Sequence, residues 1–368
     1  MFTGSTSQIG GSLLLSDNAT VSVVGSIFNG ARAAERGGGC MLAEGTSSLN
    51  MSHSILSGCS SARCGGGITI TDQARLQLLN TTISSTTAGT YGGALCVTDS
   101  GKAEVLSSTL INGRTINGNS GCVGAIDNAT VRFVNTLISS CRTPLGGGGI
   151  GMADRSRLEL INSTVTNNTA GRGGAIDAGT NVHGGGVALW NSASMLLESS
   201  ELHSNYAHYA GGGMHVSDRT TVVFKGDKKS VVQNNEAGTT GGGIRLASGL
   251  AGKTLSDFLV VDGNKVSNQT SDISVTATSI QIESSNADNL VASDSREGFL
   301  QLTLNVSGRN GMPSDDKLTS SLYDANNVKL YDQVVVTQGT ELKQAAISIK
   351  RPPGRNAALT RPSATVTP

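Results

Sequence analysis

The chain of 368 residues carries 27 Lys and Arg residues against 27 Asp and Glu residues, so its formal net charge is zero. This balance excludes the basic footprint of a nucleic-acid-binding domain as well as a polyacidic tail. Glycine is abundant, at 49 residues, whereas aromatic residues make up only 3% of the chain. A hydrophobic content of 37% with only 6 prolines is typical of a folded protein rather than of collagen or a linker. No apolar stretch approaches the roughly 18 residues of a membrane span.

The first residues, Met1–Gly11, have neither a basic segment nor an apolar segment, so the sequence shows no signal peptide. The chain starts inside one of the repeats described next, so the first repeat is incomplete. We therefore expect the chain to be a fragment of a longer precursor.

Two features recur along the chain. Two glycines followed by a small or aliphatic residue form the first feature. Acidic or amide residues, mostly 27 or 28 residues apart, form the second: Asp17, Glu44, Asp72, Asp99, Asp127, Asp154, Asn191 and Asp218. The one interval of 37 residues, between Asp154 and Asn191, indicates an insertion, which we place near residues 177–186.

Within one repeat, apolar and polar residues alternate with the period of a β-strand, as in Arg157–Asn162, and no helical period is present. We expect three short strands in each repeat. Such strands bury an apolar face only when successive copies stack in parallel, about 4.8 Å apart. The sequence therefore predicts an all-β protein, a right-handed parallel β-helix of about ten coils of about 27 residues. One inner ladder would contain Leu13, Ile68, Leu95, Ile150, Met214 and Ile244.

The glycines fit a tight corner that requires a positive φ or a close approach of two backbones. We assign this structural role to Gly66, Gly67, Gly92, Gly93, Gly148, Gly149, Gly212, Gly213, Gly242 and Gly243.

The predicted domain boundaries follow from where the repeat ends. Residues 1–290 are expected to form the β-helix. Residues 291–350 contain alternating segments such as Phe299–Val306 and are expected to form a small β-rich domain compatible with an Ig-like sandwich. Residues 351–368 are expected to be a disordered or truncated tail.

The glycine signature occurs together with strands that end in an aliphatic-x-x-Asn pattern, as in Val165–Asn168 and Val232–Asn235. This combination resembles the repeats of polymorphic outer-membrane proteins and, more broadly, is similar to the pectin-lyase-like right-handed β-helix superfamily. The resemblance covers residues 1–290 and implies the β-helix architecture. It does not imply one function, because this fold hosts lyases, hydrolases and non-catalytic adhesins.

The acidic column allows two interpretations, since stacked carboxylates repel and need a neutralising neighbour. In the first, each Asp accepts backbone N–H groups at a turn. In the second, Asp72, Asp99, Asp127 and Asp154 hold Ca²⁺ or another cation. Each Asp stands alone in its repeat, without the additional carboxylates that Ca²⁺ prefers. We therefore favour the turn interpretation and expect no cofactor.

Four of the five histidines lie among aromatic residues close to the insertion: His183, Trp190, His203, Tyr206, His208, Tyr209 and His215. Ordinary surface loops explain this cluster in the simplest way. Rings beside polar loops also suit a glycan platform, and its candidates are Trp190, Tyr206, Tyr209 and His208. His203, His208 and His215 could ligate a metal, although their spacing matches no tight metal motif.

No catalytic residue is assigned. Glycosidases need two carboxylates about 5 to 9.5 Å apart, and paired acids on one strand are absent from the sequence. Asp154–Arg155 and Asp218–Arg219 are isolated pairs, which we expect at solvated turns.

The six cysteines, Cys40, Cys59, Cys64, Cys96, Cys122 and Cys141, show no zinc spacing. Disulfides between Cys59 and Cys64 and between Cys122 and Cys141 are conceivable, and reduced cysteines within the ladders are an equal alternative.

Taken together, these patterns favour a non-catalytic, monomeric scaffold, extracellular or on a cell surface, that acts in adhesion or glycan contact. Its partner would be a polysaccharide or a cell-surface glycan. The alternative is a polysaccharide lyase or glycoside hydrolase of the pectin-lyase-like superfamily. Eight Asn-x-Ser/Thr sequons are weak evidence for a glycoprotein: Asn18, Asn50, Asn80, Asn128, Asn162, Asn167, Asn268 and Asn305.

Overall fold

A computed structural model describes residues 1–171, 182–217, 219–246, 259–271, 273–275, 277–284, 299–308, 317–323, 329–336, 344–350 and 361–367, with side chains through residue 271. The described residues form strands and turns and contain no helix. Contacts divide the chain into two units, residues 1–248 with 253–272, and residues 249–252 with 273–368. The predicted boundary near residue 290 lies outside the described residues and stays a prediction.

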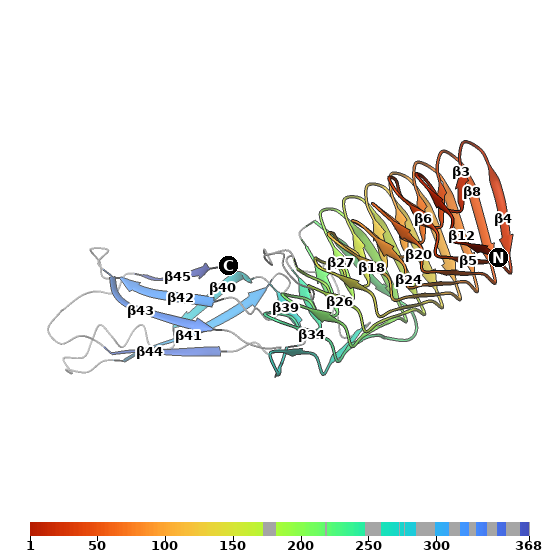
Figure 1. Ribbon diagram of the computed structural model, residues 1–368. Coiled ribbons are helices and arrows are strands. Elements are labelled where there is room, and N and C mark those ends of the chain that lie inside the picture. The colour runs from red at the N-terminus through yellow and green to blue at the C-terminus, as the bar shows by residue number, and fades with distance from the viewer. Residues whose placement is uncertain are drawn as a thin grey trace. The chain divides into compact units, whose positions relative to one another are not determined.

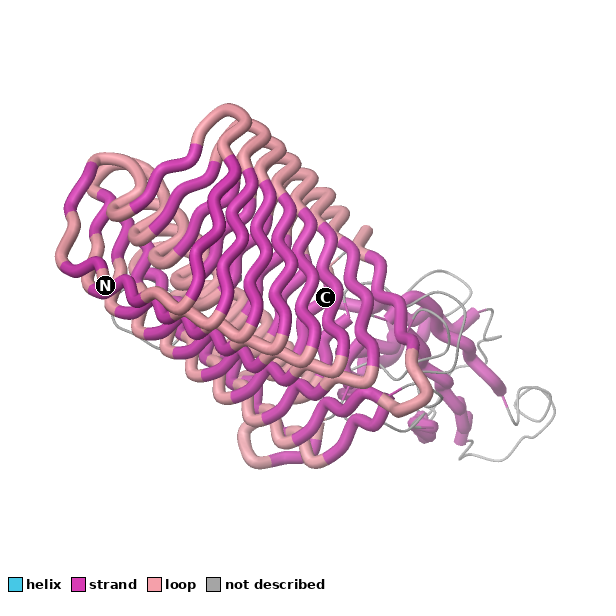
Figure 2. The backbone as a smooth tube through the Cα atoms, turned by 90° about the vertical axis from the view of Figure 1, so that its right-hand side faces the viewer, coloured by secondary structure: helices cyan, strands magenta, loops and turns pink. Residues whose placement is uncertain are grey.

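The first unit is a parallel coil (Figures 1 and 2), in which each strand pairs with its copy 27 or 28 residues further on in most coils. Each coil passes through four sheets in the order A, B, C and D. The predicted β-helix of stacked repeats is thus confirmed. The expectation of three strands in each repeat is wrong, because the sheet B strands are only two residues long and too short for an alternating pattern.

Sheets A and B come first in each coil. Sheet A consists of β1 (Phe2–Thr3), β5 (Ile27–Asn29), β9 (Ile55–Ser57), β13 (Thr82–Ser84), β17 (Thr109–Ile111), β21 (Leu137–Ser139), β25 (Thr164–Thr166), β29 (Glu201–His203), β33 (Ser230–Gln233) and β36 (Leu259–Asp262). Sheet B consists of β2 (Thr6–Ser7), β6 (Arg32–Ala33), β10 (Ser60–Ser61), β14 (Thr87–Ala88), β18 (Arg114–Thr115), β22 (Arg142–Thr143), β26 (Thr169–Ala170), β30 (Tyr206–Ala207), β34 (Glu236–Ala237), β37 (Lys265–Val266) and β38 (Gln269–Thr270).

Sheets C and D follow in each coil. Sheet C consists of β3 (Leu13–Leu15), β7 (Met41–Ala43), β11 (Ile68–Ile70), β15 (Leu95–Val97), β19 (Val123–Ala125), β23 (Ile150–Met152), β27 (Val187–Leu189), β31 (Met214–Val216), β35 (Ile244–Leu246) and β39 (Ile273–Val275). Sheet D consists of β4 (Thr20–Val24), β8 (Ser48–Ser52), β12 (Arg75–Leu79), β16 (Lys102–Leu106), β20 (Thr130–Val134), β24 (Arg157–Ile161), β28 (Ser194–Glu198) and β32 (Thr221–Lys225). The step from Ile150 to Val187 confirms the 37-residue interval, and residues 172–181 of the insertion lie outside the described residues.

The core of the coil is a set of aliphatic ladders. Ile68, Leu95 and Ile150 of the predicted ladder are fully buried. Sheet B turns mostly small residues inward, among them Ala33, Ala88 and Ala170, so the interior is narrow on that side. This narrow interior explains why the chain contains few aromatic residues.

Two polar ladders close the corners. Where sheet D meets sheet A, the hydroxyl of one coil accepts the backbone N–H of the preceding coil, as from Thr81 N to Ser108 Oγ at 3.0 Å. Where sheet A meets sheet B, a buried Asn ladder (Asn168, Asn205, Asn235, Asn264) follows the same rule. Its first step joins Asn168 N to Asn205 Oδ1 at 3.0 Å, while Asn168 Nδ2 donates to the carbonyl of Ile138 at 3.2 Å. Buried amides are thereby satisfied.

The glycines serve both of the needs expected of them, at separate positions. A positive φ occurs three residues before each described sheet C strand of the first unit, at Gly10, Gly38, Gly65, Gly92, Ser120, Gly147, Gly184, Gly211 and Gly241. The following residues meet the backbone of the next coil. A Cβ on Gly93 would overlap the nitrogen of Arg114, and one on Gly149 would lie 2.8 Å from the carbonyl oxygen of Gly186. A side chain at Gly93 would push the coils apart, whereas the Gly149 position holds the side chain of Cys122 one coil earlier.

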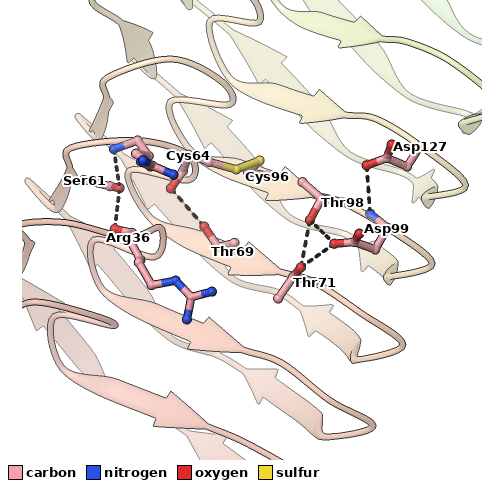
Figure 3. Close-up of a disulfide and its surroundings, with 10 residues drawn as sticks. Arg36, Ser61, Cys64, Thr69, Thr71, Cys96, Thr98, Asp99 and Asp127 are labelled. Carbon is pink, nitrogen blue, oxygen red and sulfur yellow. Dashed lines mark hydrogen bonds between the residues drawn. A yellow bond between two sulfur atoms is a disulfide. The ribbon is translucent and has the colours of Figure 1, made fainter.

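All six cysteines are paired, as Cys40–Cys59, Cys64–Cys96 and Cys122–Cys141, with Cα–Cα distances of 5.5, 5.7 and 5.4 Å. The predicted Cys122–Cys141 bridge is confirmed. The predicted Cys59–Cys64 bridge is wrong, because Cys59 is buried and faces Cys40 across the interior. Cys64 instead lies in the loop after sheet B and reaches Cys96 of sheet C (Figure 3).

The interior disulfides occupy the same two columns as glycine and the Asn ladder. Cys122 stands where the next coil has Gly149, since Val123 pairs with Ile150. Cys141 stands where the next coil has Asn168, and Cys141 N donates to Asn168 Oδ1 at 2.9 Å. A disulfide and a Gly–Asn pair are therefore alternative ways of filling one space.

The second unit contains two antiparallel sheets. One consists of β40 (Ala277–Ser284), β41 (Phe299–Gly308) and β44 (Gln344–Lys350), and the other of β43 (Lys329–Val336), β42 (Lys317–Tyr323) and β45 (Arg361–Thr367). Strand β45 pairs with β42, and the division into residues 291–350 and a tail of residues 351–368 stays a prediction. An Ig-like sandwich stays a prediction.

A first prediction concerns the exchange of a disulfide for a Gly–Asn pair. The double substitutions Cys122→Ser with Cys141→Ser and Cys122→Gly with Cys141→Asn both remove a bridge that contributes about 3 kcal/mol. The Gly–Asn variant should recover about 1 kcal/mol, because the introduced amide can extend the Asn ladder. Urea unfolding under non-reducing conditions measures the difference. Equal stability of the two variants would contradict the claim that a Gly–Asn pair fills the space of this disulfide.

A second prediction distinguishes two reasons for a glycine, a close approach of two backbones and a positive φ. Gly93→Ala should lower the free energy of unfolding by about 2 kcal/mol, because its methyl group overlaps the next coil. Gly25→Asn is the control, since Gly25 (φ 57) has open space and the same corner holds Asn80 (φ 48) two coils later. The control should change stability by less than about 0.5 kcal/mol. A Gly93→Ala protein as stable as the parent would refute this account.

Candidate glycan-contact site

The acidic column lies at the corner between sheets C and D. Asp17, Asp72, Asp99, Asp127 and Asp154 all have left-handed backbone, with φ between 57 and 63. Asp and Asn tolerate this conformation best among residues with a side chain. Glu44 does not belong to the column. Since Leu13 pairs with Met41, the position one coil after Asp17 is that of Gly45 (φ 70). Asp218 lies outside the described residues.

The carboxylates of this column accept hydrogen bonds, most of them from the preceding coil. Asp72 Oδ2 accepts from Gly45 N at 2.9 Å, and Asp127 Oδ2 from Asp99 N at 3.4 Å. Asp99 Oδ2 accepts the hydroxyls of Thr71 at 2.6 Å and Thr98 at 2.9 Å (Figure 3). The Thr71 hydroxyl lowers the pKa of Asp99. These contacts give the carboxylates of Asp72, Asp99 and Asp127 a structural role at their turns.

Metal binding would need several ligands at one place. Within the part of the chain that the structure describes, no group of three or more His, Cys, Asp and Glu side chains is arranged to hold a metal ion. His203 lies on sheet A, where its Nδ1 contacts Thr166 Oγ1 at 3.1 Å, whereas His215 is on sheet C. The structure thus separates two of the three histidines considered as a metal site.

The outer face of sheet C is covered by the loop that joins each sheet B strand to the next sheet C strand, which we call the cover loop. Several middle residues of the sheet C strands are buried beneath this loop, as Cys96 and His215 are. They meet a cover-loop residue of their own coil or of the preceding coil. Thr69 donates to the carbonyl of Cys64 at 2.9 Å, and Cys96 is bonded to Cys64 (Figure 3).

At the insertion this arrangement brings rings together. His183 of the cover loop stacks on His215 of β31, with ring centroids 4.2 Å apart and an angle of 13° between the planes. Tyr209 of the next cover loop meets the His183 ring edge-on at 5.2 Å. His215 is only 7% exposed, whereas Tyr209 is 40% exposed. The Tyr209 ring therefore faces solvent, and the stacked rings of His183 and His215 pack behind it.

The Trp190 ring lies close to the backbone of His183, where two glycines leave room for it. A Cβ on Gly146 would lie 2.5 Å from Trp190 Cζ2 and 2.8 Å from the carbonyl oxygen of His183. A Cβ on Gly151 would lie 3.0 Å from Trp190 Cζ3. We call His183, Trp190, Tyr209 and His215 the aromatic corner.

The structure brings together only part of the glycan-contact set expected from the sequence. Trp190 and Tyr209 belong to the aromatic corner, and His208 is exposed beside Tyr209 in the chain. Tyr206 lies apart on sheet B, in register with Thr169 and Glu236. His183 and His215 were missed as partners because the insertion hides the register that joins them.

The environment of His215 favours its neutral form. Burial lowers the pKa of His215 well below its usual value, and the neighbouring basic groups of His183 and Arg245 act in the same direction. Arg245 occupies the same position as His215 one coil later, on β35. A proton on His215 would therefore be both desolvated and repelled.

A row of charges on sheet D also escaped the sequence reasoning. Arg132 Nη1 contacts Glu104 at 2.6 Å, and Arg132 Nε contacts Glu159 at 3.3 Å. Arg157 Nη2 reaches Glu159 at 2.9 Å. No single strand carries a pair of these acids, whereas register between coils places their side chains side by side. Both carboxylates are shared with Arg132, so the row is an ion-pair ladder.

The structure offers no helix of the length and apolarity that a membrane crossing requires, as far as the described residues extend.

A third prediction follows from the His215 pKa. Because the folded state depresses this pKa, the unfolded state binds more protons below pH 6.5, so stability is present above that pH and is lost as the pH falls. His215→Leu places at this position the residue that Leu42 supplies in an earlier coil, and should flatten the dependence of Tm on pH between 7.5 and 5.

The control His203→Gln should leave the slope of the parent unchanged, since His203 lies on the outer face of sheet A. Thermal unfolding followed by circular dichroism gives both slopes. A His215→Leu protein with the full acid sensitivity of the parent would contradict this assignment.

Comparison with known proteins defines the family. No curated protein matches the sequence. Among solved structures, the crystal structure of the periplasmic alginate epimerase AlgG is similar over 61% of this chain and 62% of that chain, with 9% sequence identity and a TM-score of 0.32. This chain thus spans less than two thirds of the epimerase chain. The profile of the right handed beta helix region matches residues 106–295, which is more than half of the chain. The chain belongs to the right-handed β-helix family.

Proposed function

We propose that this protein is a non-catalytic scaffold that contacts a glycan through the aromatic corner. The observation that carries the proposal is the exposed Tyr209 ring, held edge-on against His183 and backed by the stacked His215. Saccharide rings present apolar faces that pack on aromatic side chains, while polar neighbours fix their orientation.

The base of this corner is rigid, which favours recognition by a preformed surface. His183 bridges to Ala210, and its carbonyl accepts Gly147 N at 2.9 Å from the preceding coil. His215 is fixed within β31, whose neighbours β27 and β35 pair with it on both sides. Little conformational entropy would therefore be lost on binding.

Location outside the cell, or at its surface, is part of the proposal. All six cysteines form disulfides, and such bonds persist in oxidising compartments. The sequons at Asn18, Asn50, Asn80 and Asn128 are exposed, so they are accessible to glycosylation.

A lyase or hydrolase of the same fold is the competing function. Its chemistry requires acidic groups free to act on a glycosidic bond. Among the described carboxylates, those of Asp72, Asp99 and Asp127 accept hydrogen bonds at their corner, and those of Glu104 and Glu159 pair with Arg132. These contacts support the non-catalytic alternative.

A fourth prediction tests the platform on a glycan array with the parent protein and two variants. Tyr209→Ala should weaken binding about tenfold or more, because the exposed ring supplies the packing surface. Tyr206→Ala is the matched control, since it removes a half-buried tyrosine that lies apart on sheet B. It should leave binding unchanged.

A parent protein that binds no glycan, or equal losses in the two variants, would refute the proposal. Incubation of the parent with acidic and neutral polysaccharides tests the alternative. Turnover that disappears on substitution of one carboxylate would establish an enzyme instead.

A further inference from the structure

Two arginines face solvent side by side on sheet B. Arg114 and Arg142 are the first residues of β18 and β22, they pair in register, and both are exposed. Neighbouring parallel strands lie about 4.8 Å apart, so the two side chains leave the same face one coil apart. Like charges directly opposite each other destabilise a sheet, and this arrangement therefore carries a cost in the free protein.

No carboxylate of the described residues offsets this charge. Neither arginine makes an ion pair or a side-chain hydrogen bond there, whereas Arg132 and Arg157 of sheet D share Glu159. Four segments form sheets A and B and the described parts of their cover loops in successive coils, and they contain no other charged residue: 82–94, 109–122, 137–149 and 164–171. Arg114 and Arg142 are thus an isolated double positive charge on an otherwise uncharged surface.

The backbone beneath the two arginines is firmly held. Thr115 and Thr143, the second residues of the same strands, are buried, and Thr115 Oγ1 donates to Thr143 Oγ1 at 2.9 Å. Arg142 N donates to the carbonyl of Gly113 at 2.9 Å. Because both strands are fixed, little backbone entropy would be lost when the two side chains close on a ligand.

An apolar surface adjoins the two charges. Ile116, two residues after Arg114, is 52% exposed, and the equivalent residue one coil later is the half-buried Pro144. A saccharide ring that carries an anionic group suits such a surface, since its apolar face can pack on aliphatic atoms.

Other anionic polymers fit this surface less well. A peptide strand would need a free sheet edge, but β18 and β22 are paired with neighbouring strands on both sides. A nucleic acid would need a wider basic surface than two arginines provide.

We infer that Arg114 and Arg142 together bind one oxyanion, a sulfate, phosphate or carboxylate substituent of an acidic saccharide whose ring packs on Ile116. Guanidinium groups bind such oxyanions through two parallel hydrogen bonds, and the anion removes the repulsion between them. This site goes beyond the proposed function and is independent of it, because the aromatic corner lies at the cover loops outside sheet C.

A fifth prediction tests the site in the full chain with nitrogen-labelled arginine, through the Nε–H signals. Sodium sulfate is added against sodium chloride of equal ionic strength. The Arg114 and Arg142 signals should shift with saturation, equally tightly at pH 5.5 and pH 7.0, since arginine stays protonated throughout. Arg142→Gln should weaken sulfate binding about tenfold.

Arg32→Gln is the matched control, because Arg32 is exposed in the same column of sheet B but its neighbours in register, Thr6 and Ser60, are uncharged. It should leave sulfate binding unchanged. Without sulfate, Arg142→Gln should unfold at the same temperature as the parent or at a higher one, because a like-charge contact is removed. A lower unfolding temperature would assign the arginine a structural role and overturn the inference.

Oligosaccharides identify the source of the anion and separate the two proposals. A sulfated and a carboxylated oligosaccharide should bind more tightly than free sulfate and than their neutral parent, and this preference should vanish in Arg142→Gln but persist in Tyr209→Ala. Equal affinity for free sulfate and for the acidic oligosaccharides would refute the saccharide as occupant. No shift of Arg114 and Arg142, or an equal shift of Arg32, would refute the site and leave glycan contact at Tyr209 intact. Acidic glycan binding that Tyr209→Ala does not weaken would uphold the site and refute the proposed function of the aromatic corner.

Discussion

Each coil supplies hydrogen-bond partners to the coil before it, and this single constraint governs the rest of the molecule. The backbone pairs in parallel on four sheets, while hydroxyls and amides at the corners accept N–H groups across the same step. Because the step leaves little space, the residue at any position must suit the residues one coil away. Glycine is required where backbones nearly touch, as at Gly93, and small residues fill the narrow side at sheet B. The residue types allowed at a position are thus set by the stack of equivalent positions in successive coils, rather than by one contact.

The outer face of sheet C is where this constraint leaves the most freedom. Its middle residues meet the cover loop in pairs, and the pairs differ from coil to coil: a threonine against a carbonyl at Thr69, a disulfide at Cys96, a stacked imidazole at His215. Each pair has to fill the same space, but no pair has to repeat. A recognition site can therefore arise in one coil without disturbing its neighbours, as the aromatic corner does.

The architecture could be predicted from the sequence because the same residue types return at the same interval. The aliphatic ladder through Ile68 and Leu95 and the 37-residue step to Val187 follow from that arithmetic alone. The two-residue strands of sheet B could not be predicted, since they are too short to alternate.

Pairings between residues of different columns were also missed. Cys64 with Cys96 and His183 with His215 depend on the path of the cover loop, and the ladder of Glu104, Arg132 and Glu159 depends on register between coils. The repeat interval predicts which residues stack in one column, but not which residues of other columns contact them.

The three disulfides differ in what they allow evolution to do with the chain. Cys40–Cys59 and Cys122–Cys141 each span 19 residues, so each closes within a single coil. A gene segment encoding one such coil could be duplicated or deleted as a whole, and its bridge would travel with it. Cys64–Cys96 spans 32 residues, more than one repeat, and joins two coils. Loss of either coil would leave an unpaired thiol, so this stretch of the solenoid is locked in copy number while the coils around it are free to vary.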